Sequence, residues 1–119
     1  MLAELSIIPV GGNPHSSAEL AKVLKLVEKS GLPYQLTPSA TCIEGEWDQI
    51  MPLIRQCHER VRKDSAHIVT LIKLEEDDGE RDKLTRNVAS VEEKLGHSLH
   101  TDPSDTKSTS LKENRGDAN

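Results

Sequence analysis

Aromatic residues are almost absent from this 119-residue sequence, which contains one Trp, one Tyr and no Phe. Proteins that bind single-stranded nucleic acid commonly stack the bases on several exposed aromatic rings. Basic residues are outnumbered as well, because 15 Lys and Arg face 20 Asp and Glu and leave a net charge of −5. Such a chain lacks the basic surface that binds phosphate backbones or anionic membranes. We therefore expect neither a nucleic acid nor a membrane as its partner.

Long apolar runs and cysteines are also scarce. No run reaches the roughly 18–20 residues that span a bilayer. The apolar start of the chain has no basic flank and is interrupted by Glu4 and Ser6, unlike a signal peptide. The two cysteines, Cys42 and Cys57, form no CxxC pair and are too few for a disulfide framework. These features predict a cytoplasmic protein with reduced thiols.

The composition changes after Gly96. Residues 97–119 are rich in Ser and Thr and contain only three apolar side chains. A segment of this kind cannot bury enough apolar surface to offset the entropy lost when it becomes ordered. We therefore predict one folded domain over residues 1–96 and a disordered Ser/Thr-rich tail over residues 97–119.

Hydrophobic periodicity predicts four strands and three helices in the order βαββαβα. In the first helix, for example, Leu20, Leu24 and Val27 recur at helical spacing, and Gly31 ends it. Asp48 is expected to cap the second helix. This order predicts an α+β ferredoxin-like sandwich, with a four-stranded antiparallel sheet and two helices on one face. The expected strands are residues 2–10, 34–37, 41–46 and 67–74, and the expected helices are residues 16–30, 48–64 and 84–95.

The last predicted strand carries the most continuous apolar run, from Ile68 to Ile72. Such a run is typical of a strand that is buried on both faces. A ferredoxin-like sheet, however, leaves one face without helices. We therefore expect the open sheet face to be buried between copies of the chain, in a homodimer or homotetramer.

Polar residues gather in the predicted hairpin. Thr37 and Ser39 are two positions apart and would share a face of a continued strand, whereas Thr41 and Glu44 could join them only through the turn and the neighbouring strand. Two interpretations stay open. The residues are either ordinary Thr-rich strand with a solvated Glu, or a polar pocket on the sheet in which Glu44 faces a cation or an amino group. A carboxylate held near an apolar sheet needs a partner.

Three further features have a structural and a functional interpretation. The loop over residues 11–17 is expected to cap a helix, and the alternative is a weak anion site or the edge of a ligand site. Capping is preferred because the loop has no Lys and Pro14 lacks an N–H. Trp47 is expected to anchor a helix to the sheet, or else to stack on a flat ligand. Arg81-Asp82-Lys83 is expected to be an exposed charge cluster, or else to form ion pairs across a subunit interface or to bind an anion.

The sequence shows no constellation for catalysis or metal binding. The five histidines include no pair at helical i, i+4 spacing beside a carboxylate, so no metal site is expected. The Ser, Cys and His residues match no nucleophile signature such as GxSxG. An enzyme is therefore possible, but no motif in the sequence supports one.

Four short motifs occur in a fixed order along residues 2–96: Ile8-Pro9-Val10-Gly11 ends the first strand, Ser16-Ser17 opens the first helix, TPSATCIEG spans residues 37–45, and Arg81-Asp82-Lys83 follows the last strand. Together they resemble the thiamine-binding proteins, a family of small ferredoxin-like domains. The segment EGEWDQIM, residues 44–51, is most similar to the fungal members.

This resemblance implies a non-enzymatic protein without a cofactor, which binds thiamine or its hydroxymethylpyrimidine half in a pocket on the sheet and assembles through its sheets. One departure is Ser39-Ala40, where family members often have Met-Gly, and a side chain in place of that Gly would narrow the pocket. The alternative is a structural or regulatory self-assembling protein without a thiamine ligand. The ligand-binding residues that the resemblance implies are Ser17, Thr37, Ser39, Thr41 and Glu44.

Overall fold

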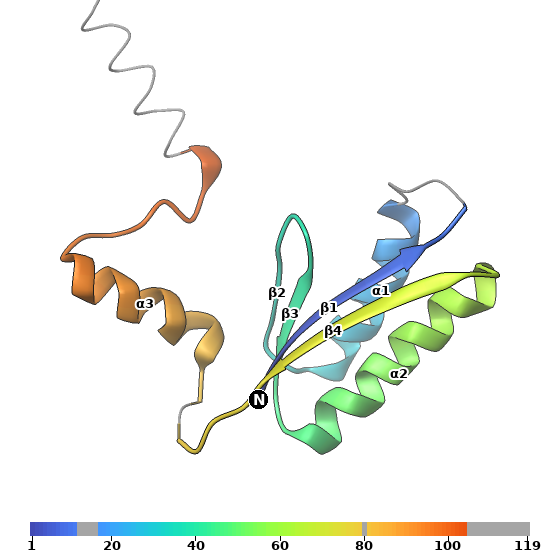
Figure 1. Ribbon diagram of the computed structural model, residues 1–119, viewed down its shortest axis with the longest axis horizontal. Helices are drawn as coiled ribbons and strands as arrows, with labels where there is room; N and C mark the ends of the chain where they lie inside the picture. Colours follow the sequence, from blue (N-terminus) through green and yellow to red (C-terminus); the bar gives the residue numbers. More distant parts are fainter. Residues whose placement is uncertain (12–16, 80, 105–119) are drawn as a thin grey trace, which may run out of the picture. The chain divides into compact units, whose positions relative to one another are not determined.

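A computed structural model describes residues 1–11, 17–79 and 81–104 of the chain (Figure 1). Its strands pair antiparallel in the order β2-β3-β1-β4, which confirms the predicted ferredoxin-like α+β fold. The elements are β1 (Leu2–Pro9), α1 (Ser17–Ser30), β2 (Tyr34–Leu36), β3 (Thr41–Glu44), α2 (Trp47–Asp64), β4 (Ile68–Glu75) and α3 (Lys83–Leu95).

The chain divides into two compact units, Met1–Thr85 and Arg86–Asn119. The first contains the whole sheet, α1, α2 and the first turn of α3, and the second contains the rest of α3. Residues 105–119, most of the predicted tail, lie outside the described residues. The domain boundary after residue 96 and the disorder of the tail stay predictions.

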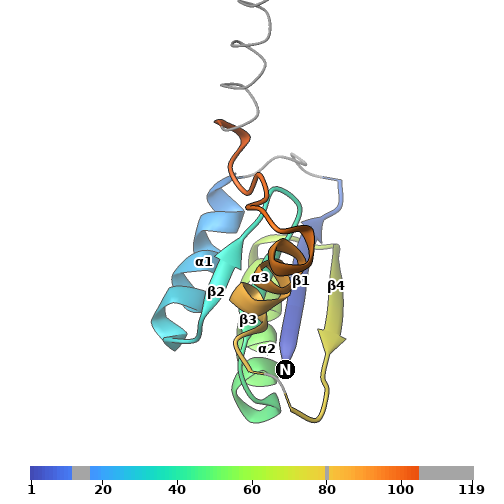
Figure 2. The ribbon, with the colours of Figure 1, turned by 90° about the vertical axis from the view of Figure 1, so that its left-hand side faces the viewer.

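Helices α1 and α2 cover one face of the sheet (Figures 1 and 2). Strand alternation directs Ala3 and Leu5 of β1 and Ile43 of β3 toward these helices, where all three are buried. The helices contribute apolar side chains at i, i+3, i+4 and i+7 spacing, so that a single core forms between the two layers. The buried helix residues of this core are Val23, Val27, Ile50, Leu53, Ile54, Cys57 and Val61.

The start of α2 differs from the prediction. The N-cap is Glu46 rather than Asp48, and the backbone N–H of Glu46 donates a hydrogen bond to Gln49 Oε1 at 3.0 Å in a capping box. Asp48 instead lies in the first turn, where a carboxylate interacts favourably with the helix dipole. Because α2 begins at Trp47, Pro52 lies inside the helix.

The prediction that β4 is buried on both faces is wrong for the single chain. This strand lies at the edge of the sheet, with β1 as its neighbour. Leu71 on one face is 55% exposed, and Ile72 on the other is 43% exposed. The apolar run was correctly recognised as a strand, but an edge strand receives side-chain contacts from one neighbour instead of two.

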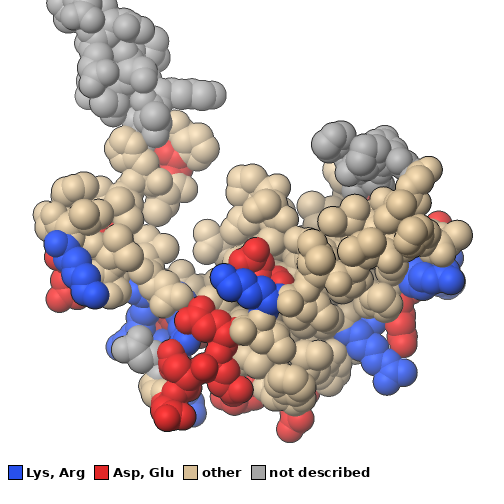
Figure 3. All heavy atoms as spheres, in the orientation of Figure 1, with Lys and Arg blue, Asp and Glu red and all other residues tan. Residues whose placement is uncertain are grey.

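The sheet face opposite α1 and α2, called the open face below, carries an apolar region and a charged region. Ile8 pairs with Val69, and all three apolar residues Ile8, Val69 and Leu71 are exposed. Farther along the strands Glu4 pairs with Lys73. Figure 3 shows a broad stretch of uncharged surface over β1 and β4.

Candidate functional site

A pocket of about 380 Å³ opens where the sheet changes from four strands to two. The pairing of β1 with β3 stops at Leu5, whereas the pairing of β1 with β4 continues to Pro9. Beyond Leu5 the β2–β3 hairpin therefore separates from β1, as Figure 1 shows. The start of α1 lines the resulting space. The volume of this pocket falls within the range of about 300–1,000 Å³ that is typical of small-molecule pockets.

The walls of the pocket are mainly apolar. They come from β1, from α1, from the hairpin and from one residue of α2. Apolar walls of this kind exclude water from the flat part of a ligand, while a few polar groups fix its orientation. The apolar lining residues are Leu5, Ile7, Ile8, Pro9, Leu20, Val23, Leu36, Pro38, Ala40 and Val61.

Hydroxyl groups form much of the polar part of the pocket. Thr37 Oγ1 donates to the carbonyl oxygen of Ala40 at 2.8 Å and accepts the N–H of Ala40 at 3.1 Å, which closes the hairpin turn. Ser6 Oγ donates to the carbonyl oxygen of Ser39 at 3.0 Å and so ties β1 to the turn. Together with Ser17 at the start of α1, these residues place four hydroxyl groups on the lining.

Glu19 adds a carboxylate to the lining. It lies in the first turn of α1, and its side chain is 21% exposed. Lys22 Nζ lies 3.1 Å from Glu19 Oε1 and 2.9 Å from Asp64 Oδ2, and so joins α1 to α2. Arg60 also pairs with Asp64, at 2.8 Å.

The structure brings three of the five predicted ligand-binding residues together. Ser17, Thr37 and Ser39 line the same pocket, although Ser17 comes from a different element. Thr41 is buried on the helix-facing side of β3 and does not belong to the lining. Glu44 lies at the far end of β3 and does not line the pocket either.

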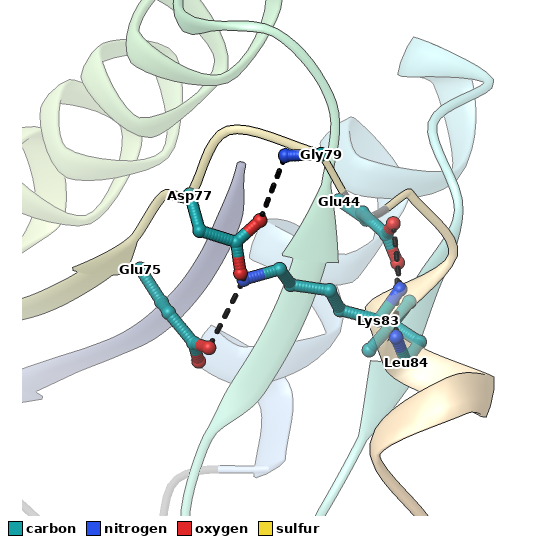
Figure 4. A network of polar contacts seen from close by, with 6 residues as sticks. All are labelled: Glu44, Glu75, Asp77, Gly79, Lys83 and Leu84. Atoms are coloured by element: carbon teal, nitrogen blue, oxygen red, sulfur yellow. Dashed lines mark hydrogen bonds and ion pairs between the residues drawn. The ribbon is translucent and has the colours of Figure 1, made fainter. Parts of the chain in front are cut away.

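Glu44 instead holds the start of α3. Its Oε2 accepts the backbone N–H of Lys83 at 2.9 Å, and its Oε1 accepts that of Leu84 at 3.0 Å (Figure 4). These are N–H groups of the first helical turn, which have no partner within the helix itself. A carboxylate from a neighbouring strand thus caps the helix.

The pKa of the Glu44 carboxyl is lower than usual. Partial burial raises this pKa, but the backbone N–H groups of Leu84, Lys83 and Asp82 together lower it by more. Hydrogen bonds to an ionised carboxylate favour the charged form. Glu44 is therefore ionised at neutral pH and occupied by the backbone of its own chain.

Lys83 is buried, which contradicts the prediction that Arg81-Asp82-Lys83 is an exposed charge cluster. The Lys83 side chain is 3% exposed, and its Nζ lies 3.0 Å from Glu75 Oε1 and 2.6 Å from Asp77 Oδ2. Figure 4 shows this ammonium between the two carboxylates. Arg81 and Asp82 are exposed, so the prediction holds for those two residues.

The aromatic residues lie outside the pocket lining. Trp47 begins α2 and is 53% exposed, so it does not anchor the helix to the sheet as expected. Tyr34 lies on β2, and its hydroxyl donates to Glu28 Oε1 at 3.2 Å. Residues 12–16, which include most of the loop that was predicted to cap a helix or bind an anion, lie outside the described residues.

Neither cysteine has the environment of a nucleophile. Cys57 is buried in the core, and this burial raises its pKa to about 11. Burial and the negative charge of Glu4 raise the pKa of Cys42 as well. Since a thiolate is the reactive form, these raised pKa values disfavour reaction of either thiol at neutral pH.

The described residues form neither a metal-binding cluster nor a membrane-spanning helix. Over residues 1–11, 17–79 and 81–104, no three His, Cys, Asp or Glu side chains come together as a metal site would require. Among the helices in that part of the chain, none combines the length and the apolar character that a membrane crossing needs.

Sequence reasoning missed Ser6 and Glu19 as pocket residues. Ser6 interrupts an apolar strand, and a polar residue there is a weak signal of a polar surface. Glu19 lies in the first turn of a helix, where acidic residues are common, so its type and position give no signal of a pocket. Its position beside the hairpin turn depends on how α1 packs on the sheet.

Comparison with known proteins identifies the family. Residues 3–92 match the sequence profile of the thiamine-binding protein family. The chain belongs to this family. Among individual relatives, UPF0045 protein YqgV of Bacillus subtilis is 35% identical over 97 residues, which cover 76% of this chain and 90% of the relative. The fungal UPF0045 protein ECM15 of Eremothecium gossypii is 36% identical over 59 residues, which cover 49% of this chain and 56% of the relative.

Solved structures of proteins of similar length share the fold of this chain. Protein MJ1052 of Methanocaldococcus jannaschii superimposes with a TM-score of 0.71 at 26% identity, covering 77% of this chain and 95% of that protein. A proposed thiamine biosynthesis or salvage protein of Thermotoga maritima superimposes with a TM-score of 0.65 at 15% identity, covering 76% and 96%. At 15% identity, the similarity to the Thermotoga maritima protein shows a shared fold alone.

Proposed function

We propose that the chain is a non-enzymatic cytoplasmic protein that binds thiamine, or its hydroxymethylpyrimidine half, in the pocket between β1, α1 and the β2–β3 hairpin. The observation that carries this proposal is the pocket itself, which combines apolar walls with hydroxyl groups and one carboxylate. Membership of the thiamine-binding protein family supports the same ligand class.

The chemistry of the pocket suits such a ligand. Thiamine consists of an aminopyrimidine, which donates and accepts hydrogen bonds, and a thiazolium ring with a permanent positive charge. The apolar walls fit the faces of the two rings, and the hydroxyls of Ser17 and Ser39 fit the polar edge of the pyrimidine. Because no Trp, Tyr or Phe belongs to the described lining, ring stacking does not contribute and we expect modest affinity.

Isothermal titration calorimetry with thiamine and with hydroxymethylpyrimidine tests this function. The wild-type protein should bind at least one of them. A Ser39→Leu variant should bind it at least about tenfold more weakly, because the larger side chain fills part of the pocket. Ser98→Leu, the same change at an exposed position in the second unit, is the matched control. No heat at millimolar ligand with folded wild-type protein would overturn the proposal.

We further propose that the open face joins two or more copies of the chain. The observation in favour is the exposed apolar region of Ile8, Val69 and Leu71. Ile8 also lines the pocket, so the pocket would lie at the margin of such an interface. A purely structural, self-assembling protein needs only this interface, and would show assembly without any heat of ligand binding.

A further inference from the structure

We propose that Glu19 makes the pocket selective for unphosphorylated ligands that are cationic or neutral, and that it rejects their phosphate esters. This inference rests on the proposed function, since it names the form of the ligand that the same pocket accepts. It concerns a residue that the resemblance to the family did not indicate.

The first step is the charge of the pocket. Among the described residues of the lining, Glu19 is the one ionisable residue, and Lys, Arg and His are absent from them. A phosphate group that enters a protein usually meets Lys or Arg side chains, or several backbone N–H groups. In this pocket the described side chains would offer it hydroxyl groups and a negative charge.

The second step is the direction of the charge. Lys22 neutralises part of the Glu19 charge, but Lys22 does not line the pocket and also pairs with Asp64. Lys22 therefore bridges Glu19 to Asp64 on α2, and its ammonium adds no positive charge to the described lining of the pocket. Because Glu19 lines the pocket and Lys22 does not, a ligand there would lie closer to the carboxylate than to the ammonium, and the interaction between two charges weakens with distance.

The third step is the environment of the carboxylate. The Glu19 side chain is 21% exposed and stands beside the apolar side chains of Leu20 and Val23 on the lining. Solvent screens a charge less in such a setting than at an open surface. The positive end of the α1 dipole lies nearby and would attract an anion, but Glu19 is in the first turn and offsets it.

The consequence concerns which form of one compound binds. A thiazolium cation would be attracted to Glu19, and a neutral hydroxymethylpyrimidine would be tolerated. A phosphate monoester brings close to two negative charges at neutral pH, and these would be repelled by Glu19 unless they stayed outside the pocket.

Titration calorimetry of the whole chain with thiamine and with thiamine monophosphate tests the inference. The wild type should bind thiamine at least about tenfold more tightly than the monophosphate. In Glu19→Gln, which keeps the shape and removes the charge, thiamine affinity should fall about three- to tenfold while monophosphate affinity stays level or rises. Glu19→Asp keeps the charge and should keep the preference for thiamine.

Glu59→Gln is the matched control. Glu59 is an exposed carboxylate on α2 that pairs with Arg55 on its own helix, as Glu19 pairs with Lys22, but it does not line the pocket. This variant should leave the ratio of the two affinities unchanged. Circular dichroism melting curves should show that each variant is folded.

The possible failures can be told apart. Equal affinity of the wild type for thiamine and its monophosphate, or an unchanged ratio in Glu19→Gln, would overturn the role of Glu19 and leave the proposed function standing. If the folded wild type bound neither thiamine nor hydroxymethylpyrimidine, the proposed function would fail, and the inference with it.

Discussion

Glu44 at the end of β3 accepts the backbone N–H of Lys83 at 2.9 Å, although the two residues are 39 positions apart. A strand carboxylate therefore caps the first turn of α3. In the sheet, β1 lies between β3 and β4. The hydrogen bond therefore joins the segment that follows β4 to β3, a strand that does not pair with β4.

Replacing Glu44 by Ala should release the first turn of α3. The N–H groups of Lys83 and Leu84 would lose their acceptor, and loss of a helix cap of this kind costs about 1–2 kcal/mol. Hydrogen exchange should show faster exchange of these two amides. Glu76→Ala removes a carboxylate from an exposed position in the same region and is the control. Unchanged exchange in Glu44→Ala would contradict the capping role.

The Glu44 contact should also depend on pH. Its pKa is lowered in the folded protein, so the carboxylate stabilises the fold fully at a pH above its ordinary value of 4.5. This contribution is lost as the pH falls through the lowered pKa. The difference in melting temperature between wild type and Glu44→Ala should therefore be constant near neutral pH and shrink in acid. A difference that grew on acidification would contradict this sign.

Asp64 offers a second titration that can be measured. Hydrogen bonds from Lys22 and then Arg60 lower the pKa of the Asp64 carboxyl to about 2, compared with 3.8 for an ordinary Asp. Stability from this contact is present above pH 3.8 and is lost as the pH falls toward 2. In Lys22→Met the Asp64 pKa, followed by NMR of the carboxyl carbon, should rise toward 3.8. Lys25→Met, on the same helix, should leave the Asp64 pKa at about 2.

Lys83→Met should loosen the loop after β4. The buried ammonium holds Glu75 and Asp77 together, and its loss leaves two carboxylates facing each other. Hydrogen bonds to Asp77 and Glu75 raise the Lys83 pKa above 10.5, so its contribution is complete below that pH and disappears only above it. We expect a lower melting temperature than for Lys94→Met, a change near the end of α3, with the difference constant between neutral pH and about pH 9.

Leu71→Lys tests the self-association of the open face. Leu71 is exposed in the apolar region of that face, and a charge there cannot be buried between two sheets without a partner. Sedimentation should show the wild type above its monomer mass of 13.1 kDa and the variant at that mass. Ile72→Lys, on the same strand but on the other face, should not change assembly. A monomeric wild type at micromolar concentration would overturn the proposal.

The sequence was sufficient for the fold and for part of the site. Alternation and helical spacing are local properties, and they were enough to predict the order of elements and the antiparallel sheet. The hydroxyl groups of Thr37 and Ser39 were also found, because a hairpin turn brings its own residues together whatever surrounds it. The strand character of residues 68–75 is also local and was recognised. The position of this strand at the edge of the sheet depends on the strand order, which no local pattern contains.

Residues that depend on packing between distant elements were not placed correctly from the sequence. Thr41 and Glu44 are close to Ser39 along the chain, but the pairing of β3 with β1 turns Thr41 into the core and carries Glu44 away from the pocket. The partner that Glu44 was expected to need is a backbone segment 39 residues later. No local pattern contains that information.

The pairing of β3 with β1, which stops at Leu5 and Thr41 beside the pocket, has a consequence for variation within the fold. Each residue added to both arms of the hairpin would extend the ladder along β1 and occupy space that is now hollow, while the layer between the sheet and its two helices would stay as it is. Insertions and deletions at the β2–β3 turn would therefore enlarge, shrink or remove the ligand pocket without changing the rest of the fold.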